Sequence, residues 1–180
     1  MKTEFEARIL EINVDAIVKK LESLGAEKVA ERKLRRLVYD LEPGNETSWI
    51  RLRTDGTKST LTVKEHQAEG IDGMKELEVV VDDFDMANLF LSKIGREPRW
   101  YQENRRTSYV LDGTEIEIDS WPLIPTYLEI EGRSVGEVEA MIGRLGFSLA
   151  DMTTLCTKDI YSKYGIDLHS IADLRFEQNV

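Results

Sequence analysis

Near the N-terminus, charged and apolar residues alternate in a way that fits few folds. In a β-strand, successive side chains point to opposite faces, so Glu4, Glu6 and Arg8 share one face while Phe5 and Ala7 share the other. The apolar face can pack against helices. The charged face must then meet either bulk water or a polar interior. Which of the two holds decides what the chain can do.

The same alternation returns in later segments, at residues 49–53, 59–65, 75–79, 114–119 and 127–131. One such face on its own is usually solvated, as in most antiparallel sheets. These faces, however, segregate by sign: Arg51 and Arg53 are both basic, whereas Glu129 and Glu131 are both acidic. Neighbouring like charges are unfavourable unless an opposite charge lies between them. The repetition favours strands that close into a barrel, with acids that can hold divalent cations and bases that can hold an anion in one cavity.

Helices are predicted between these strands. Residues 13–25, 84–94 and 134–146 show helical spacing of apolar side chains, and each helix ends at or just before a glycine. In the third segment, Ser134 and Glu137 have the spacing of a capping box.

Two further strand signals complete the predicted fold. Residues 33–41 are predicted to form a strand, and the dipeptide Asp112-Gly113 predicts a tight hairpin between residues 105–111 and 114–119. The loops are short, and no linker rich in Gly, Ser or Pro divides the chain. We therefore expect a single α+β domain over residues 1–180.

The composition limits the classes of function. Among 180 residues, 24 are Lys or Arg and 34 are Asp or Glu, which gives a net charge of −10 and argues against binding to nucleic acid or to an anionic membrane. No apolar run reaches the roughly 20 residues of a membrane span, and the N-terminus lacks a signal-peptide pattern, so we expect a cytoplasmic protein. The single cysteine, Cys156, and only two histidines argue that any bound metal is held by oxygen atoms.

The ordered set of charged positions resembles a known family. The set consists of Glu4-x-Glu6-x-Arg8, Arg51-x-Arg53, Lys64, Glu76-x-Glu78, Arg106 followed by Tyr109, Asp119, and the segment 127–131 with Glu129 and Glu131. This set is similar to the CYTH family of triphosphate tunnel metalloenzymes, which includes class IV adenylate cyclases, thiamine triphosphatases and inorganic tripolyphosphatases. The resemblance implies a closed antiparallel β-barrel of about eight strands with helices packed outside, which binds a triphosphate in its tunnel.

The resemblance also implies roles for individual residues. It implies that Mg²⁺ or Mn²⁺ is the cofactor, because hard cations prefer carboxylate and phosphate oxygens. The implied metal ligands are Glu4, Glu6, Glu129 and Glu131, and the implied catalytic residues are Glu129, Glu131 and Arg8. The implied triphosphate-binding residues are Arg8, Arg51, Arg53, Lys64, Arg106 and Lys158. The residues implied to support the neighbouring basic side chains are Glu76, Glu78 and Asp119.

Two positions depart from the family pattern. Arg8 stands where the signature usually has lysine; arginine keeps the charge and can bind phosphate through two nitrogens, but it cannot give up a proton. Asn104 stands where the family tends to have a lysine two residues before the position of Arg106. Strand alternation predicts that the adjacent Arg105 points outward.

Three functions are compatible with this pattern. The first is metal-dependent hydrolysis of inorganic tripolyphosphate or of a small organic or nucleoside triphosphate. The second is a class IV type adenylate cyclase, for which we find no clear base-recognition motif; we expect Trp49, Trp100 and Trp121 to pack in the core or at the barrel ends. The third is a non-catalytic module that binds polyphosphate or nucleotide. In each case the partner is a small-molecule triphosphate, and a homodimer is possible.

Overall fold

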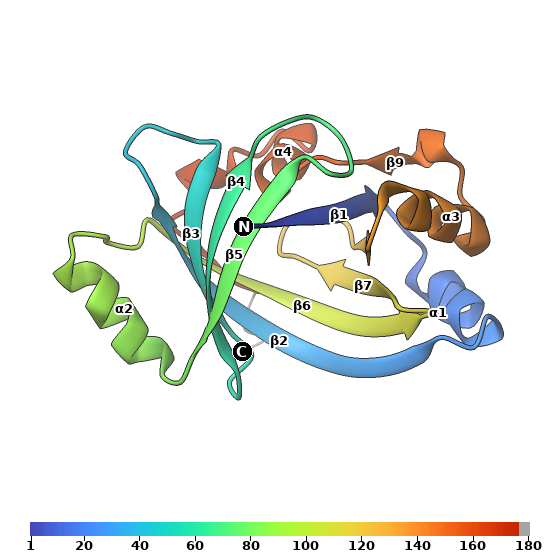
Figure 1. Ribbon diagram of the computed structural model, residues 1–180, viewed down its shortest axis with the longest axis horizontal. Coiled ribbons are helices and arrows are strands. Elements are labelled where there is room, and N and C mark those ends of the chain that lie inside the picture. The colour runs from blue at the N-terminus through green and yellow to red at the C-terminus, as the bar shows by residue number, and fades with distance from the viewer. Residues whose placement is uncertain (177–180) are drawn as a thin grey trace.

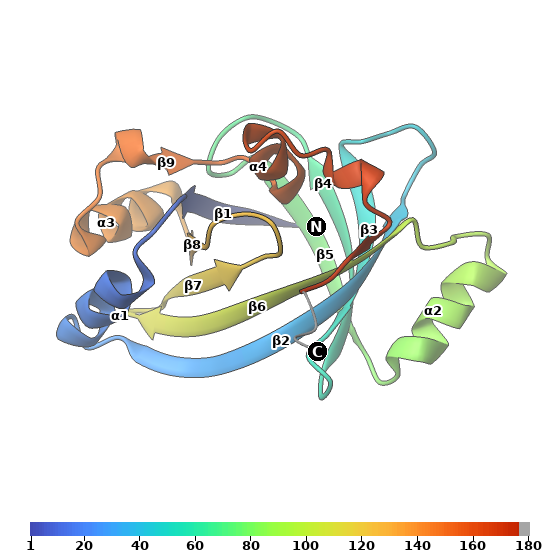
Figure 2. The ribbon, with the colours of Figure 1, turned by 180° about the vertical axis from the view of Figure 1, so that it is seen from behind.

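The computed structural model describes residues 1–176, and eight strands of this part of the chain close into an antiparallel barrel (Figures 1 and 2). The order around the barrel is β6-β2-β3-β4-β5-β1-β8-β7, and β7 pairs with β6 to close it. The strands are β1 Lys2–Ile9, β2 Glu27–Asp40, β3 Ser48–Thr54, β4 Ser59–His66, β5 Met74–Val81, β6 Trp100–Leu111, β7 Thr114–Ser120 and β8 Tyr127–Gly132. The α+β barrel expected from the charged strand faces is confirmed.

Helices and two very short strands surround the barrel. They are α1 Val14–Ser23, α2 Phe84–Lys93, α3 Val135–Leu145, α4 Thr157–Lys163, the 3-10 helices Leu149–Asp151 and Leu168–Ser170, and the strands β9 Met152–Thr153 and β10 Asp173–Leu174. Strand β9 pairs with β1, and β10 runs parallel to β6. Within residues 1–176, every helix is too short or too polar to cross a bilayer.

The third helix begins with only half of the predicted capping box. The Ser134 hydroxyl accepts a hydrogen bond from the Glu137 backbone N–H at 3.3 Å, as the motif requires. The Glu137 carboxylate, however, accepts from the backbone N–H and the side chain of Arg133 instead of reaching the Ser134 N–H. The helix position was therefore predicted well, while an arginine next to the cap diverted the carboxylate.

Strand β2 is longer than its sequence pattern predicts. We expected it at residues 33–41, but it begins at Glu27 and pairs with β6 over nearly its whole length, with an irregular register between Lys28 and Ala30. The N-terminal part is mostly polar, so apolar periodicity did not mark it. Backbone hydrogen bonds to β6 hold this part in the sheet, and the Asp112-Gly113 hairpin places β6 next to β7 as predicted.

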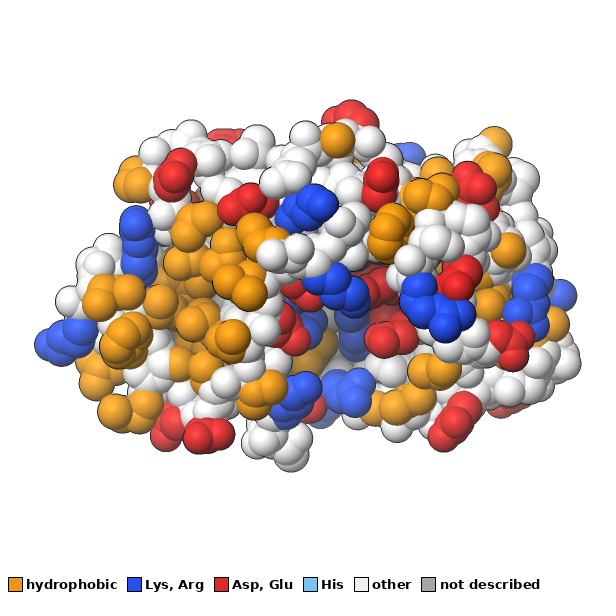
Figure 3. All heavy atoms as spheres, viewed as in Figure 1, with side chains coloured by type: hydrophobic (Ala, Val, Ile, Leu, Met, Phe, Trp, Pro, Cys, Tyr) orange, Lys and Arg blue, Asp and Glu red, His pale blue; other side chains and the backbone are white. Residues whose placement is uncertain are grey.

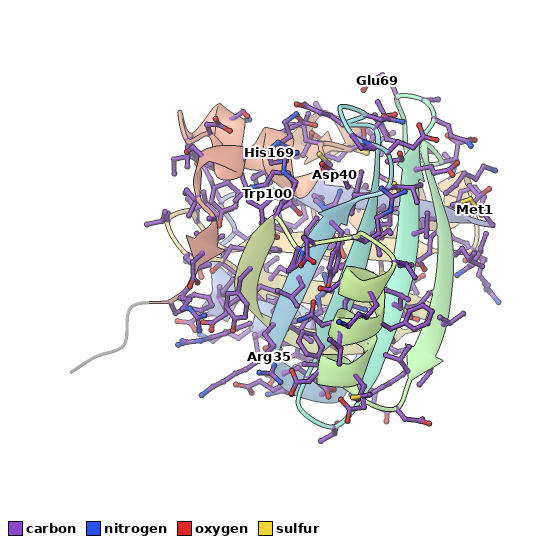
Figure 4. All side chains as sticks on the ribbon, turned by 90° about the vertical axis from the view of Figure 1, so that its left-hand side faces the viewer. Met1, Arg35, Asp40, Glu69, Trp100 and His169 are labelled. Carbon is purple, nitrogen blue, oxygen red and sulfur yellow. The ribbon has the colours of Figure 1, made fainter. Side chains whose placement is uncertain are left out.

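The main hydrophobic core lies outside the barrel. Helices α1 and α3 lie at one end of the barrel (Figure 2). Apolar side chains from the outer faces of β1, β6, β7 and β8 pack against them, and the fully buried members include Leu21, Leu128, Ile130 and Ile142. Helix α2 lies across the outside of the sheet (Figure 4), and a smaller cluster joins it to β3 through Leu52 and Leu91. Because the apolar faces of these strands pack against helices, their alternate faces are left for the barrel interior.

Truncating a core side chain on β8 tests this inside-out arrangement. Ile130 is fully buried between the barrel wall and α3, so Ile130→Ala should lower the free energy of unfolding by about 2–5 kcal/mol. The control is Val29→Ala, at a half-exposed position of β2, which should change it by less than about 0.5 kcal/mol. Urea unfolding followed by circular dichroism measures both values, and equal effects of the two substitutions would contradict this packing.

Candidate functional site

The barrel encloses one cavity of about 670 Å³ that gathers every site residue expected from the sequence. Figure 3 shows acidic and basic side chains together in a hollow on this face of the molecule. The expected residues that line the cavity are Glu4, Glu6, Arg8, Arg51, Arg53, Lys64, Glu76, Glu78, Arg106, Asp119, Glu129, Glu131 and Lys158. The charged faces of β1, β3, β4, β5, β7 and β8 thus meet a polar interior and not bulk water.

Arg8 ties three parts of the chain together inside the cavity. Its Nε donates to Glu129 Oε2 at 2.8 Å, its Nη2 donates to Glu6 Oε1 at 2.9 Å, and its Nη1 donates to the Leu155 carbonyl at 3.0 Å. A lysine has a single nitrogen and could not make these three contacts in this geometry. The arginine at this position therefore bridges two carboxylates and anchors the segment between β9 and α4.

Glu129 lies between two guanidinium groups. On its other side, Arg106 Nη2 donates to Glu129 Oε1 at 2.8 Å, and Arg106 also forms a bidentate pair with the fully buried Asp119. Burial alone would raise the pKa of Glu129, but Arg8 and Arg106 outweigh it and hold that pKa well below its usual range. Glu129 is therefore a fixed carboxylate that holds both arginines in place.

The opposite wall of the cavity carries the basic residues of β3 and β4. Lys64 Nζ lies 2.7 Å from Glu4 Oε2, and Arg51 Nη2 lies 3.5 Å from Glu78 Oε2. Arg53 is 3.8 Å from the same Glu78 oxygen, and the nearby Arg51 together with burial lowers the pKa of Arg53 to about 9. The acids at positions 76 and 78 of β5 thus partly neutralise a wall in which basic residues crowd one another.

Comparison with known proteins identifies the fold. No protein-family model matches the sequence, and no curated protein matches it. Among solved structures, the PH1012 protein of Pyrococcus horikoshii OT3 has a TM-score of 0.74 and 22% identity, and the match covers 87% of this chain and 98% of that one. A candidate adenylate cyclase from Vibrio parahaemolyticus has a TM-score of 0.75 and 18% identity, with 89% and 98% covered. The chain has the CYTH-like tunnel fold.

A plant protein shares this tunnel fold as well. It is a candidate adenylyl cyclase from Hippeastrum with a dominant triphosphatase activity, with a TM-score of 0.61, 17% identity, and 92% of this chain and 96% of that one covered. At these identities the likeness shows the CYTH-like fold, and the activity of this chain has to be argued from its own residues.

The acidic residues of β1 and β8 suit a divalent cation in charge and donor type. In residues 1–176, no three acidic, histidine or cysteine side chains already converge as a ligand set, because Lys64 engages Glu4 and Arg8 engages Glu6. Glu131, in contrast, faces Glu6 across the strand pair, and among the described residues only Lys2 Nζ, at 3.7 Å, forms an ion pair with it. Burial and the nearby glutamates raise the pKa of Glu131 to about 7. A hard cation would relieve this excess of negative charge.

The two departures from the CYTH pattern have different structural consequences. Arg105 is exposed and lies over the Phe176 ring, as strand alternation predicted. Asn104 is buried, and its amide connects Asp119 to Arg36: Nδ2 donates to Asp119 Oδ1 at 3.0 Å, and Oδ1 accepts from Arg36 Nη2 at 2.7 Å. Arg36 also lines the cavity, so a cation from β2 reaches the region next to Asn104.

Several charged residues of the CYTH-like cavity were missed from the sequence. On β2, Arg35 points outward to the Phe84 ring (Figure 4), so alternation places Arg36 inside, but the strand was identified by its apolar residues alone. On β7, alternation places Glu117 on the same face as Asp119, and Glu117 is buried in the cavity wall. The further acidic and basic lining residues that were missed are Arg32, Asp40, Glu46, Asp55, Lys58, Arg99 and Glu115.

One end of the cavity is covered by the C-terminal part of the chain. Lys158 of α4 pairs with Glu46 in the loop between β2 and β3. The rings of Trp100 and His169 stack with centroids 4.2 Å apart, and both residues line the cavity (Figure 4). Trp100 and Trp121 are buried and Trp49 is half-buried, and all three, which were expected to pack in the core or at the barrel ends, line the cavity.

The raised pKa of Glu131 predicts how the stability of the metal-free protein depends on pH. The favourable contribution of protonated Glu131 is complete below about pH 4.5 and is lost as the pH rises through about 7, because the unfolded chain releases this proton first. Glu131→Gln should therefore match the original protein at pH 4.5 and exceed its free energy of unfolding at pH 8 by about 1–3 kcal/mol.

Urea unfolding in EDTA at the two pH values measures this difference, and substitution of the exposed Glu69 by Gln is the control (Figure 4). A difference between Glu131→Gln and the original protein that is the same at both pH values would show that Glu131 holds no such proton.

Proposed function

We propose that this protein hydrolyses a triphosphate substrate inside the barrel with the help of a divalent cation. One observation carries the proposal: a single cavity holds a basic wall on β3 and β4 and an acidic cluster on β1 and β8. A pure anion-binding site gains nothing from the acidic cluster unless a cation joins it. The dominant triphosphatase activity of the Hippeastrum protein, which has the same fold, supports the proposal.

The basic residues would bind and orient the phosphate chain. Arg51 and Arg53 come from β3, Lys64 from β4 and Arg106 from β6, so together they can contact successive phosphates along the tunnel. Phosphoryl transfer depends mainly on in-line positioning and on neutralising the charge of the transferred group, and fixed guanidinium groups supply both. Arg8 already donates from all three of its side-chain nitrogens, so its main part would be to position Glu6 and Glu129.

Glu4, Glu6 and Glu131, with Glu129 beside them, would hold Mg²⁺ or Mn²⁺. When bound, such a cation neutralises phosphate oxygens and makes water more acidic. Of the two expected catalytic carboxylates on β8, Glu131 would be the proton acceptor for the attacking water, because both oxygens of Glu129 already accept hydrogen bonds from Arg8 and Arg106. Glu129 would stay ionised between Arg8 and Arg106 and keep these side chains in place.

Removing one carboxylate of the acidic cluster tests hydrolysis directly. Glu4→Gln should lower Mg²⁺-dependent phosphate release from tripolyphosphate by about 100-fold or more, because Gln is a weaker cation ligand and a weaker partner for Lys64. EDTA should abolish the activity of the original protein. Glu69→Gln, in an exposed loop, is the matched control. Full activity in both Glu4→Gln and Glu129→Gln would end the proposal.

The second candidate activity is cyclisation of ATP, which the Vibrio parahaemolyticus neighbour of the same fold favours. In hydrolysis the nucleophile is water, whereas in cyclisation it is the ribose 3′-hydroxyl, and the same phosphate-binding residues could serve both. We expect orthophosphate, and no cyclic AMP, when tripolyphosphate, ATP and thiamine triphosphate are each supplied with Mg²⁺ or Mn²⁺. Chromatography of the products separates the two reactions, and cyclic AMP with pyrophosphate from ATP would favour the cyclase.

A further inference from the structure

Arg36 of β2 is the buried cation of the cavity whose environment is least explained by the fold. Only 8% of the residue is exposed, and it lines the cavity together with Trp121. Its Nη2 donates to Asn104 Oδ1 at 2.7 Å, and its guanidinium carbon lies 4.4 Å from the centroid of the Trp121 ring. Two neutral side chains therefore fix the position and the plane of this guanidinium group.

No carboxylate within residues 1–176 lies within 4 Å of Arg36, whereas the other arginines that line the cavity each have one. Arg8 contacts Glu6 and Glu129, and Arg106 contacts Asp119. The remaining pairs are Arg32 with Asp55, Arg51 with Glu76 and Glu78, Arg53 with Glu78, and Arg99 with Asp40.

The Nε–H of Arg36 is also unpaired. It is buried and has no hydrogen-bond acceptor among the described residues. Asp119 is reached only through the Asn104 amide, at 3.0 Å from Nδ2. A buried N–H without an acceptor is unfavourable, so this donor is positioned for an acceptor that the described chain does not supply.

Neighbouring positive charges further destabilise the charged form of Arg36. Burial, and then the positive charges of Arg51, Arg53 and Arg106, lower the pKa of Arg36 well below the usual arginine value. A buried cation without a counter-ion destabilises a fold unless a bound group compensates it. An anion that reaches all four guanidinium groups would remove both the repulsion and the missing acceptor.

We propose that Arg36 binds the phosphate chain of the substrate and is a main determinant of affinity for polyanions in this cavity. The inference rests on the proposed function, in which a triphosphate occupies the tunnel. Asn104 and Trp121 orient the guanidinium group, which offers its Nε–H to a phosphate oxygen. An arginine suits this role because its planar fork matches phosphate oxygens.

Binding and stability measured on the same variant test the proposal. Arg36→Met keeps an unbranched side chain and removes the charge, so the Kd for tripolyphosphate in EDTA, measured by calorimetry, should rise by about tenfold or more. The melting temperature of the ligand-free variant should stay equal or rise, because a buried uncompensated charge is gone. Arg105→Met, on the exposed face of β6, should leave the Kd unchanged.

Moving the cation to the neighbouring strand provides a rescue. Asn104 contacts the Arg36 guanidinium, so a lysine at position 104 reaches the same part of the cavity. In the Arg36→Met background, Asn104→Lys should bring the Kd back to within about threefold of the original value, because the positive charge is restored there. Arg36→Lys, which keeps the charge and loses the fork, should bind less tightly than the original protein and more tightly than Arg36→Met.

The outcomes separate this inference from the proposed function. If the original protein binds tripolyphosphate and Arg36→Met binds it equally well, Arg36 is a structural residue and the inference fails, while the proposed function stands. A lower melting temperature with unchanged Kd in both Arg36→Met and Arg36→Lys would lead to the same conclusion. If the original protein binds none of tripolyphosphate, ATP and thiamine triphosphate, either in EDTA or with Mg²⁺, both proposals fail.

Discussion

The structure depends on the pairing of acidic and basic side chains inside a closed barrel. The apolar faces of β1, β6, β7 and β8 pack against α1 and α3, and that of β3 packs against α2, so the alternate faces of these strands point inward. Charges that leave water need partners at close range. Arg8 with Glu129, and Lys64 with Glu4, supply such pairs between residues that are far apart in the sequence. The barrel can therefore close only if the charged side chains inside it are paired.

This compensation is incomplete at two places in the same cavity. Around Glu131, buried carboxylates outnumber their basic partners. Around Arg36, guanidinium groups repel one another, and no carboxylate among residues 1–176 forms an ion pair with Arg36 itself. A divalent cation would relieve the first imbalance and a phosphate chain the second. The unpaired charges in the cavity therefore raise the free energy of the folded protein. A divalent cation and a polyanion would together neutralise them, so the fold favours binding of both.

Arg8 connects the chemistry of the cavity to the end of the chain. Its contact with the Leu155 carbonyl holds the segment between β9 and α4 against the barrel, and α4 in turn places Lys158 next to Glu46 at one end of the cavity. The same guanidinium group fixes the two carboxylates that lie on β1 and β8. A lysine could balance the charge, but its single nitrogen could not join the two strands and the C-terminal segment.

The sequence by itself determined most of the strand faces, the helices α1, α2 and α3, the closed barrel and many of the charged residues in the cavity, because alternation and sign segregation are local properties of the chain. Only the tertiary structure decided which acid meets which base. Glu129 became a fixed carboxylate and Glu131 a group that titrates near neutral pH through neighbours on other strands. Strand alternation places Arg36 inside the barrel, but only the tertiary structure decided that its nearest partners are neutral, because that depends on which strands the barrel brings together.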